Sequence, residues 1–231
     1  MNLLIIDTET TGLDPQNSCV IELGAVLYSV DHQTSLHHVA TLLTAQDNPA
    51  ERINRIPAAA LPAIAPRLQS YALQVFWEMA QDADYAVAHN APFDAQWFGQ
   101  GCLPVLAKGE VPLRWLCTAT DFTWPHQTRP SESLVSLALA HGIGVGSAHR
   151  ALTDCQLIAA LFDRMEDLPG MIVQALKPRA IYKAIVSYDN RHLAKEAGFR
   201  WNQLVPVAWA RKLTENEVAS LPFQVQKVRD V

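Results

Sequence analysis

Residues 2–7, NLLIID, form a continuous apolar run that ends in an acidic residue. A run without alternation is typical of a strand that is buried on both faces in the centre of a sheet. The segments 20–28 and 36–43 also favour strands. Because all three are joined by short turn-forming stretches, they predict an antiparallel meander.

The rest of the first 167 residues alternates between helical and strand patterns. Residues 67–79 carry apolar side chains at helical spacing, after a proline-rich stretch, 48–66, that we expect to be a loop. Residues 85–88 predict a short strand, and 133–141 and 151–165 predict helices. Strands followed by alternating helices and strands indicate an α/β fold with a mixed sheet that is flanked by helices.

Charge divides the 231-residue chain unevenly. Residues 1–167 hold 8 Lys and Arg against 18 Asp and Glu, whereas residues 168–231 hold 10 against 5. The change coincides with the sequence DLPG at 167–170, whose Pro-Gly pair is typical of a helix end. We therefore expect two domains, 1–167 and 168–231, the second a small basic α+β domain.

Several classes of protein are disfavoured by composition. The four cysteines form no CxxC pair, so we expect neither a disulfide framework nor a zinc cluster. The apolar run at the start is too short for a signal peptide or a membrane span. We expect a cytoplasmic protein with no membrane association.

Three blocks bring together four carboxylates and one histidine: IIDTETTG at 5–12, AHNAPFD at 88–94 and AHRALTDC at 148–155. The five side chains are Asp7, Glu9, Asp94, His149 and Asp154. Hard divalent cations prefer oxygen ligands, and two of them about 3.5–4 Å apart neutralise the charge that develops when a phosphodiester is cut. The blocks predict a site for two Mg²⁺ or Mn²⁺ ions in a nuclease.

Spacing assigns a position to each group. Asp7 and Glu9 are two residues apart, so at the end of a strand both point to the same side. Asp94 follows a predicted strand at the start of a helix. His149 and Asp154 are separated by about 140° on one helix, at about 100° per residue. His149 must therefore precede the helix, as a mobile base whose ordinary pKa of about 6.5 suits proton transfer.

Each block by itself also has an ordinary structural explanation. An acid at a helix start complements the helix dipole, and a lone histidine is most often a surface residue. The occurrence of all three blocks in order, each at the end of an element, favours the site. The remaining histidines are expected at the surface or in loops, except that His89 and Asn90 are expected to brace the turn before Asp94.

With these motifs, residues 1–166 resemble the DnaQ-like (DEDDh) family of 3′-5′ exonucleases, which includes proofreading subunits and RNase T-type enzymes. The resemblance implies an RNase H-like fold, the four acids as metal ligands and His149 as general base. It further implies that residues in and near the first two blocks hold the terminal nucleotide. The substrate-binding residues are then Thr10, Thr11, Gly12, Leu13, Asn90 and Phe93, with Phe93 packed beneath the site.

One segment departs from that family's pattern. Many relatives carry a His-Gly-Ile-like sequence where this chain has NRIP at 54–57. Arg55 then either contacts a phosphate or is a solvated loop charge, and we favour the solvated charge.

The basic C-terminal segment allows two interpretations. Lys195, Arg200 and Trp201 lie close together in LAKEAGFRWN, with Lys183 and Arg191 nearby. Basic residues interleaved with aromatic ones suit phosphates and stacked bases. A unit of this size has few other large apolar groups, so we favour Phe199, Trp201 and Trp209 as its own core.

The leading hypothesis is a metal-dependent exonuclease that releases nucleoside 5′-monophosphates from single-stranded 3′ ends, with DNA favoured. An exoribonuclease that processes RNA and a non-catalytic module associated with nucleic acid or a polymerase remain open as alternatives. The expected partners are single-stranded DNA or RNA 3′ ends and a polymerase or another replication or repair protein.

Overall fold

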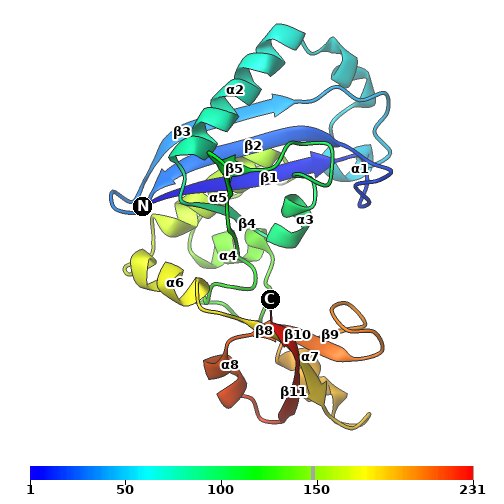
Figure 1. Cartoon of the computed structure of the whole chain (residues 1–231), viewed down its shortest axis with the longest axis vertical. Coiled ribbons are helices and arrows are strands. Elements are labelled where there is room, and N and C mark those ends of the chain that lie inside the picture. The colour runs from blue at the N-terminus through cyan, green and yellow to red at the C-terminus, as the bar shows by residue number, and fades with distance from the viewer. Residues whose placement is uncertain (147–148, 231) are drawn as a thin grey trace.

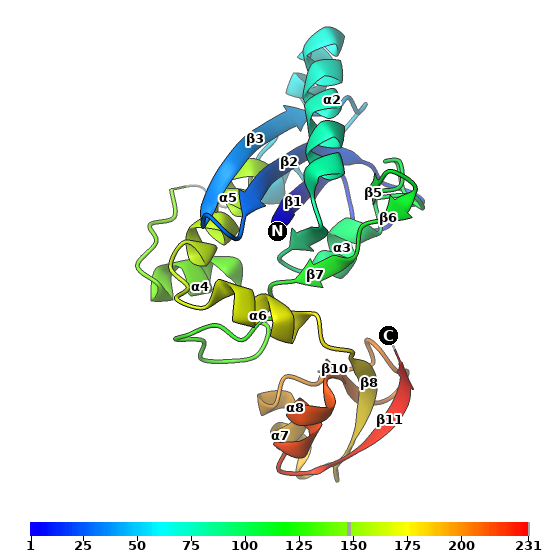
Figure 2. The ribbon, with the colours of Figure 1, turned by 60° about the vertical axis from the view of Figure 1, so that its left-hand side comes forward.

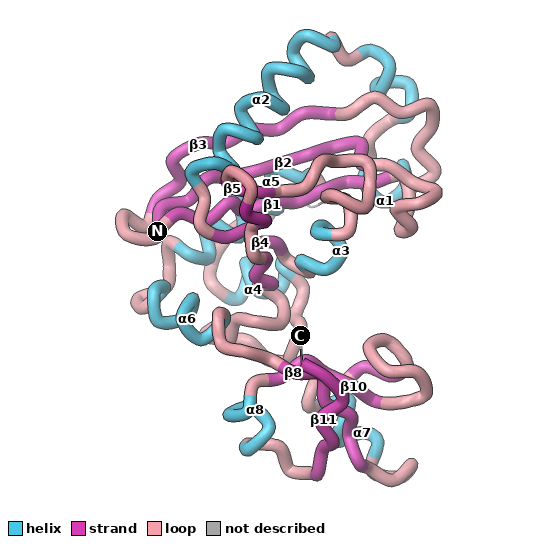
Figure 3. Tube along the Cα trace, in the orientation of Figure 1, coloured by secondary structure: helices cyan, strands magenta, loops and turns pink. Residues whose placement is uncertain are grey.

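A computed structural model describes residues 1–146 and 149–230 of the chain. Its larger unit is a five-stranded sheet in the order β3-β2-β1-β4-β7, with helices on both faces (Figure 1). A four-stranded sheet near the C-terminus forms a second unit below the first (Figure 3). The predicted mixed sheet flanked by helices, with a small α+β region after it, is confirmed. Within the described residues, no helix combines the length and apolar character needed to cross a membrane.

The larger unit begins with the predicted meander, in which β1 pairs antiparallel with β2 and β2 with β3. The strands β4 and β7 then extend the sheet in parallel with β1. Its strands are β1 (Asn2–Thr10), β2 (Val20–Ser29), β3 (Thr34–Leu42), β4 (Tyr85–Ala88) and β7 (Trp115–Cys117), with a separate hairpin of β5 (Ala107–Lys108) and β6 (Val111–Pro112). Its helices are α1 (Glu51–Asn54), a 3₁₀ helix (Ala58–Ala63), α2 (Pro66–Asp82), α3 (Ala91–Ala95), α4 (Leu134–Ala140), α5 (Ala151–Phe162) and α6 (Leu168–Ala175).

Alternate residues of β1 serve two separate cores. Leu3 and Ile5 pack with α4, α5 and α6 on one face of the sheet, whereas Leu4 and Ile6 pack with α2 on the other. Successive side chains of a strand point to opposite faces, so the odd-numbered residues of β1 all face α5. This alternation decides where the acids of the first block point.

Three details differ from the sequence-based expectation. β1 continues to Thr10, three residues beyond the predicted end, because its polar residues still pair with β2. The expected loop at 48–66 contains α1 and the 3₁₀ helix, held by the buried amides of Asn48 and Asn54. The strand β7, only three residues long, was not predicted.

The helix α6 begins where the sequence suggested a domain boundary. Asp167 accepts a hydrogen bond from Gly170 N at 2.9 Å, so Pro169 and Gly170 lie in the first turn of a helix and do not end one. Leu168 and Ile172 are fully buried in the core beneath α5. We therefore propose a boundary at residues 176–179 in place of 167/168.

The second unit is a sheet with helices on one face. It consists of β8 (Ala180–Ile185), α7 (Arg191–Glu196), β9 (Arg200–Trp201), β10 (Trp209–Leu213), α8 (Glu215–Ala219) and β11 (Gln224–Asp230). Phe199 is fully buried in its core and Trp209 packs against that core. Trp201 is 51% exposed, so its assignment to the core was wrong; β9 is an edge strand, which leaves one side of the ring uncovered.

Arg179 joins the two units. Its guanidinium donates to the backbone oxygen of Asp121 at 3.0 Å in the first unit, and to Glu217 at 2.7 Å in α8. The Arg179 and Asp121 side chains are nearly inaccessible to solvent. A buried charge that lost its partners would be costly, so this contact favours a fixed attachment.

Candidate active site

The carboxylates of Asp7 and Glu9 lie at the end of the β1 face that packs on α5. In the antiparallel pairing, Asp7 is opposite Gly24 and Glu9 is opposite Glu22 of β2. Cross-strand partners point to the same face of a sheet. The strands β1 and β2 together therefore present three acids, Asp7, Glu9 and Glu22, and Gly24 to the start of α5.

Gly24 allows α5 to approach the sheet at this point. A Cβ atom at Gly24 would lie 2.4 Å from Leu152 N and 2.5 Å from the carbonyl carbon of Ala151. Neither backbone atom can move away without displacing the helix. The missing side chain thus lets the first turn of α5, which carries Asp154, lie directly over the acids of β1.

Asp94 is held beside β1 at the edge opposite β2. It lies in the first turn of α3, which follows β4, the parallel neighbour of β1. Its Oδ1 accepts hydrogen bonds from Thr8 N at 3.0 Å and from Thr8 Oγ1 at 2.8 Å. Thr8, in the first block, therefore holds the carboxylate of Asp94, in the second block, next to β1.

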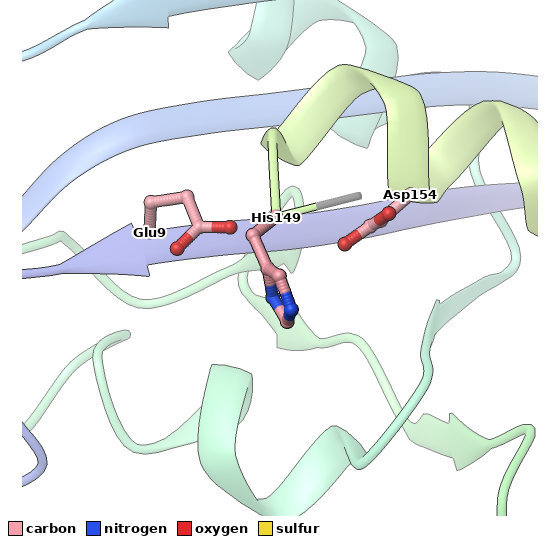
Figure 4. A group of neighbouring side chains, drawn as sticks. All are labelled: Glu9, His149 and Asp154. Atoms are coloured by element: carbon pink, nitrogen blue, oxygen red, sulfur yellow. The ribbon is translucent and has the colours of Figure 1, made fainter. Parts of the chain in front are cut away.

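The structure brings the side chains of His149 and Asp154 close to Glu9. α5 begins after Arg150, so His149 precedes the helix with a left-handed φ of 62°, and Asp154 lies in its first turn. Side-chain ligand atoms of Glu9, His149 and Asp154 all lie within 4.8 Å of one another (Figure 4). The expected mobility of His149 stays a prediction.

Electrostatics shows that the cluster holds excess negative charge. Burial and the neighbouring Asp94 and Asp154 carboxylates raise the pKa of Asp7 well above its ordinary value. Burial, followed by the charges of Asp154 and Glu22, raises the pKa of Glu9 to about 7. Asp94 also reaches a pKa of about 7, through burial, although its hydrogen bonds from Thr8 oppose the shift. Each carboxylate disfavours the charge of the others.

These residues fit divalent metal ions. One oxygen of Asp154, Oδ1, is buried and has no hydrogen-bond partner among the described residues. Buried polar atoms are normally paired, so a buried carboxylate oxygen without a partner is what a missing cation would leave. Carboxylate oxygens with one imidazole also form a donor set suited to Mg²⁺ or Mn²⁺.

Sequence reasoning missed a pair that holds the start of α5. Glu22, almost fully buried, accepts two bonds from Arg150 Nε at 3.1 and 3.0 Å, and a third from an Arg150 terminal nitrogen at 2.7 Å. The same carboxylate accepts a bond from Ala151 N at 3.1 Å. Two features of the sequence could have indicated this pair. One is Glu22, an acid inside the otherwise apolar strand IELGAV, and the other is Arg150, which directly follows the predicted base His149.

The segment expected to hold the terminal nucleotide forms a tight turn after β1. Thr10 Oγ1 donates to Gly12 O at 2.7 Å, and Thr11 N donates to Cys19 O at 3.0 Å. A Cβ at Gly12 would meet Ser18 Oγ at 2.5 Å, so the turn closes without a side chain there. The turn leaves Leu13 80% exposed.

The other expected substrate residues surround α3. Asn90 is exposed and left-handed, with a φ of 80°, immediately before the helix. Phe93 is partly buried and packs edge-on against Trp97 at 5.9 Å between ring centroids. His89 bonds to Thr118 Oγ1 and to the backbone oxygen of Glu132, so it ties β4 to the loop after β7 and not to the turn of Asp94.

The segment 54–57 contributes backbone support and one exposed charge. The buried Asn54 donates from Nδ2 to Thr10 O at 3.2 Å and so fixes the end of β1. Arg55 is exposed in a left-handed conformation, with a φ of 58°. No ion pair of Arg55 is found among the described residues, consistent with the solvated charge that we favoured.

Comparisons with known proteins agree with this geometry. Residues 4–162 match the Exonuclease (RNase_T) family model. The DNA polymerase III subunit epsilon of Treponema pallidum (strain Nichols) is 30% identical over 170 residues, 69% of this chain and 74% of the relative. Residues 180–228 match a domain family of unknown function, DUF8626.

Solved structures show the same fold. Exonuclease X in complex with 5′ overhanging duplex DNA is 25% identical, with a TM-score of 0.51 over 75% of this chain and 99% of that one. E. coli Exonuclease I in complex with a dT13 oligonucleotide has a TM-score of 0.61 at 12% identity, over 96% and 68%. The nuclease domain of 3′hExo, a DEDDh family member bound to rAMP, has a TM-score of 0.55 at 17% identity, over 71% and 90%. The family model covers more than half of the chain, which therefore belongs to the exonuclease family and is a 3′-5′ exonuclease.

Proposed function

We propose that this exonuclease uses two divalent metal ions to remove nucleoside 5′-monophosphates from the 3′ ends of single-stranded nucleic acid, with DNA as the favoured substrate. The observation that carries the proposal is the cluster of Glu9, His149 and Asp154 atoms within 4.8 Å, beside two further acids whose charges repel one another. Divalent cations held by these groups would balance the negative charge and could neutralise a phosphodiester that is being cut.

In this mechanism Asp7, Glu9, Asp94 and Asp154 hold the ions. When bound, the metal ions neutralise the charge on the reacting phosphate and on its leaving oxygen. His149 accepts the proton of the attacking water, because it lies outside α5 and next to Glu9 and Asp154. Thr8 keeps Asp94 in place, while Glu22 and Arg150 position the segment that carries His149.

The turn after β1 is the proposed site for the terminal nucleotide. The exposed Leu13 offers an apolar side chain for the terminal base, and the backbone of Thr11 and Gly12 closes the turn beneath it. Phe93 of α3 is the proposed support beneath this region, and Asn90 lies exposed at the start of the same helix. In this arrangement the 3′ end enters between the turn and α3.

A polymerase or another replication or repair protein is the proposed protein partner. The support is the relative in Treponema pallidum, which by its name is a subunit of DNA polymerase III. An RNA substrate is the alternative, because the related 3′hExo domain was solved with rAMP.

The proposed function is tested with strands labelled at either end. DNA and RNA strands, incubated with Mg²⁺, with Mn²⁺ or with chelator, should lose their 3′ label first and only when metal is present. Faster loss from DNA would support the favoured substrate, and faster loss from RNA would establish the alternative. Persistence of both labels in every metal would refute the function.

A further inference from the structure

The small sheet has one face that carries four cations and no acid. Cross-strand pairing aligns Arg200 with Ala210, Ala210 with Lys183, and Lys183 with Gln226. A second row aligns Lys212 with Ile181, and Ile181 with Arg229. Paired residues share a face, so these rows place the four cations on one surface. The basic face is defined here as Lys183, Arg200, Lys212 and Arg229.

Among the residues that the structure describes, no helix packs against the basic face. The opposite face, which carries Tyr182 and Leu213, packs against α7 and α8 in the core of the unit. Figure 2 shows both helices on the same side of the strands β8 and β11. Arg200 and Arg229 are exposed, and Lys183 and Lys212 are half-buried.

The cations on the two faces differ in their partners. On the helical side, Arg211 pairs with Glu217, and Lys227 pairs with Asp230. Within the described residues, none of the four side chains of the basic face has an ion pair or a hydrogen bond. The positive charge of this domain is therefore left unbalanced on one side of the sheet.

The chemistry of the face favours a phosphate chain over a folded protein. Cations in one row are two strands apart, about 10 Å at the usual strand spacing. Protein interfaces have cores that are depleted of charged residues, lysine among them, although arginine is enriched there. A basic surface that follows a backbone is typical of single-strand binding.

We propose that the basic face binds the single strand whose 3′ end is held at the active site. The catalytic unit itself is unsuited to the task, because residues 1–167 hold 18 acids against 8 Lys and Arg. A separate cationic surface on the attached domain offsets this repulsion and retains the strand between cuts. The proposal rests on the proposed exonuclease function, since it assigns the rest of the same substrate to this face.

The test neutralises the two exposed cations of the face in the full-length protein. Arg200→Gln/Arg229→Gln is compared with Arg191→Gln/Lys195→Gln, which removes the same charge from exposed positions on α7, across the sheet. Fluorescence anisotropy with long labelled oligothymidylate and oligouridylate, in chelator over a salt series, gives the Kd and its salt dependence. Thermal melting of each variant confirms that it folds.

Each lost phosphate contact lowers the slope of log Kd against log salt by about 0.7 on single strands. We expect the variant of the basic face to lose about 1.4 from this slope and to bind roughly tenfold or more weakly at moderate salt. The α7 variant should keep the wild-type slope. Equal losses in both variants, or no loss in either, would overturn the proposal.

A short substrate separates this proposal from the function on which it rests. The p-nitrophenyl ester of thymidine 5′-monophosphate reaches the active site but is too short to reach the small sheet. With Mn²⁺, both variants should hydrolyse it at the wild-type rate. Failure of the wild-type protein to hydrolyse it, or to degrade long strands, would refute the proposed function and leave the binding result to stand by itself.

Discussion

The metal-site cluster on β1 and the basic face of the small sheet both carry unbalanced charge, but of opposite sign and in opposite settings. The acids are buried and repel one another, so their pKa values rise. The cations are exposed or half-buried and have no ionic partner within the described residues.

Burial determines how specifically an unbalanced charge indicates the ligand that balances it. Buried like charges are costly, so these acids are relieved either by protons or by a specific cation. Exposed like charges cost little in water and by themselves indicate only a surface that attracts its opposite.

The largest expected effect is the loss of a metal ligand. Asp7→Asn should lower activity by at least about 10³-fold, since several kcal/mol of charge stabilisation depend on bound metal and each 1.4 kcal/mol is a factor of ten. The metal-free variant should melt no lower than wild type, because one repelling charge is gone. Asp82→Asn, at the exposed end of α2, is the control, and full activity of Asp7→Asn would contradict the site.

Removal of the base should have the next largest effect. His149→Gln should reduce the rate about 10²- to 10⁴-fold, the usual contribution of a positioned proton acceptor. Because His149 is exposed, the melting temperature should stay the same. Steady-state rates of strand degradation measure the change, with the exposed His192→Gln as the matched control. A variant as active as the control would remove His149 from the mechanism.

Metal should stabilise the protein, and more so at higher pH. Folding raises the pKa values of Glu9 and Asp94 from 4.5 and 3.8 to about 7, so the folded state binds more protons than the unfolded state between these limits. The stability of the metal-free protein is therefore greatest below about pH 4 with respect to these groups and is lost as the pH rises through 7.

The corresponding measurement is a melting curve with and without Mn²⁺. At 100 times Kd, metal should add about 2.7 kcal/mol at pH 8, which raises Tm by about 5–10 °C in a protein of this size. At pH 5.5 protons compete for the carboxylates, and the rise in Tm should be smaller. An equal rise at both pH values would argue that the ion binds elsewhere.

The smallest expected effect concerns the support of the base. Arg150→Met leaves the buried Glu22 without its charged donor and should cost about 1–3 kcal/mol of the free energy of unfolding. The double variant with Glu22→Gln should cost less than the sum of the two single changes, because no charge is left unpaired. Additive losses in a urea denaturation series would show that the pair does not act as a unit.

Local patterns in the sequence were sufficient for much of the fold. The meander, the strand at 85–88 and the major helices follow from apolar periodicity, which depends only on neighbouring residues. The three-residue β7 was missed because its pattern is too short. We propose a later boundary than 167 because Pro169-Gly170 is compatible with both a helix end and a helix start, and only the packing of α6 against the first core favours the helix start.

The sequence by itself determined the acids, the histidine and the elements that carry them, because these residue types at these spacings have few other uses. Only the tertiary structure decided that Gly24 admits α5, that Glu22 holds Arg150, and that α7 and the basic face lie on opposite sides of the small sheet. The physical reason is that close approach, ion pairing and strand register depend on residues far apart in the chain. No local pattern records them.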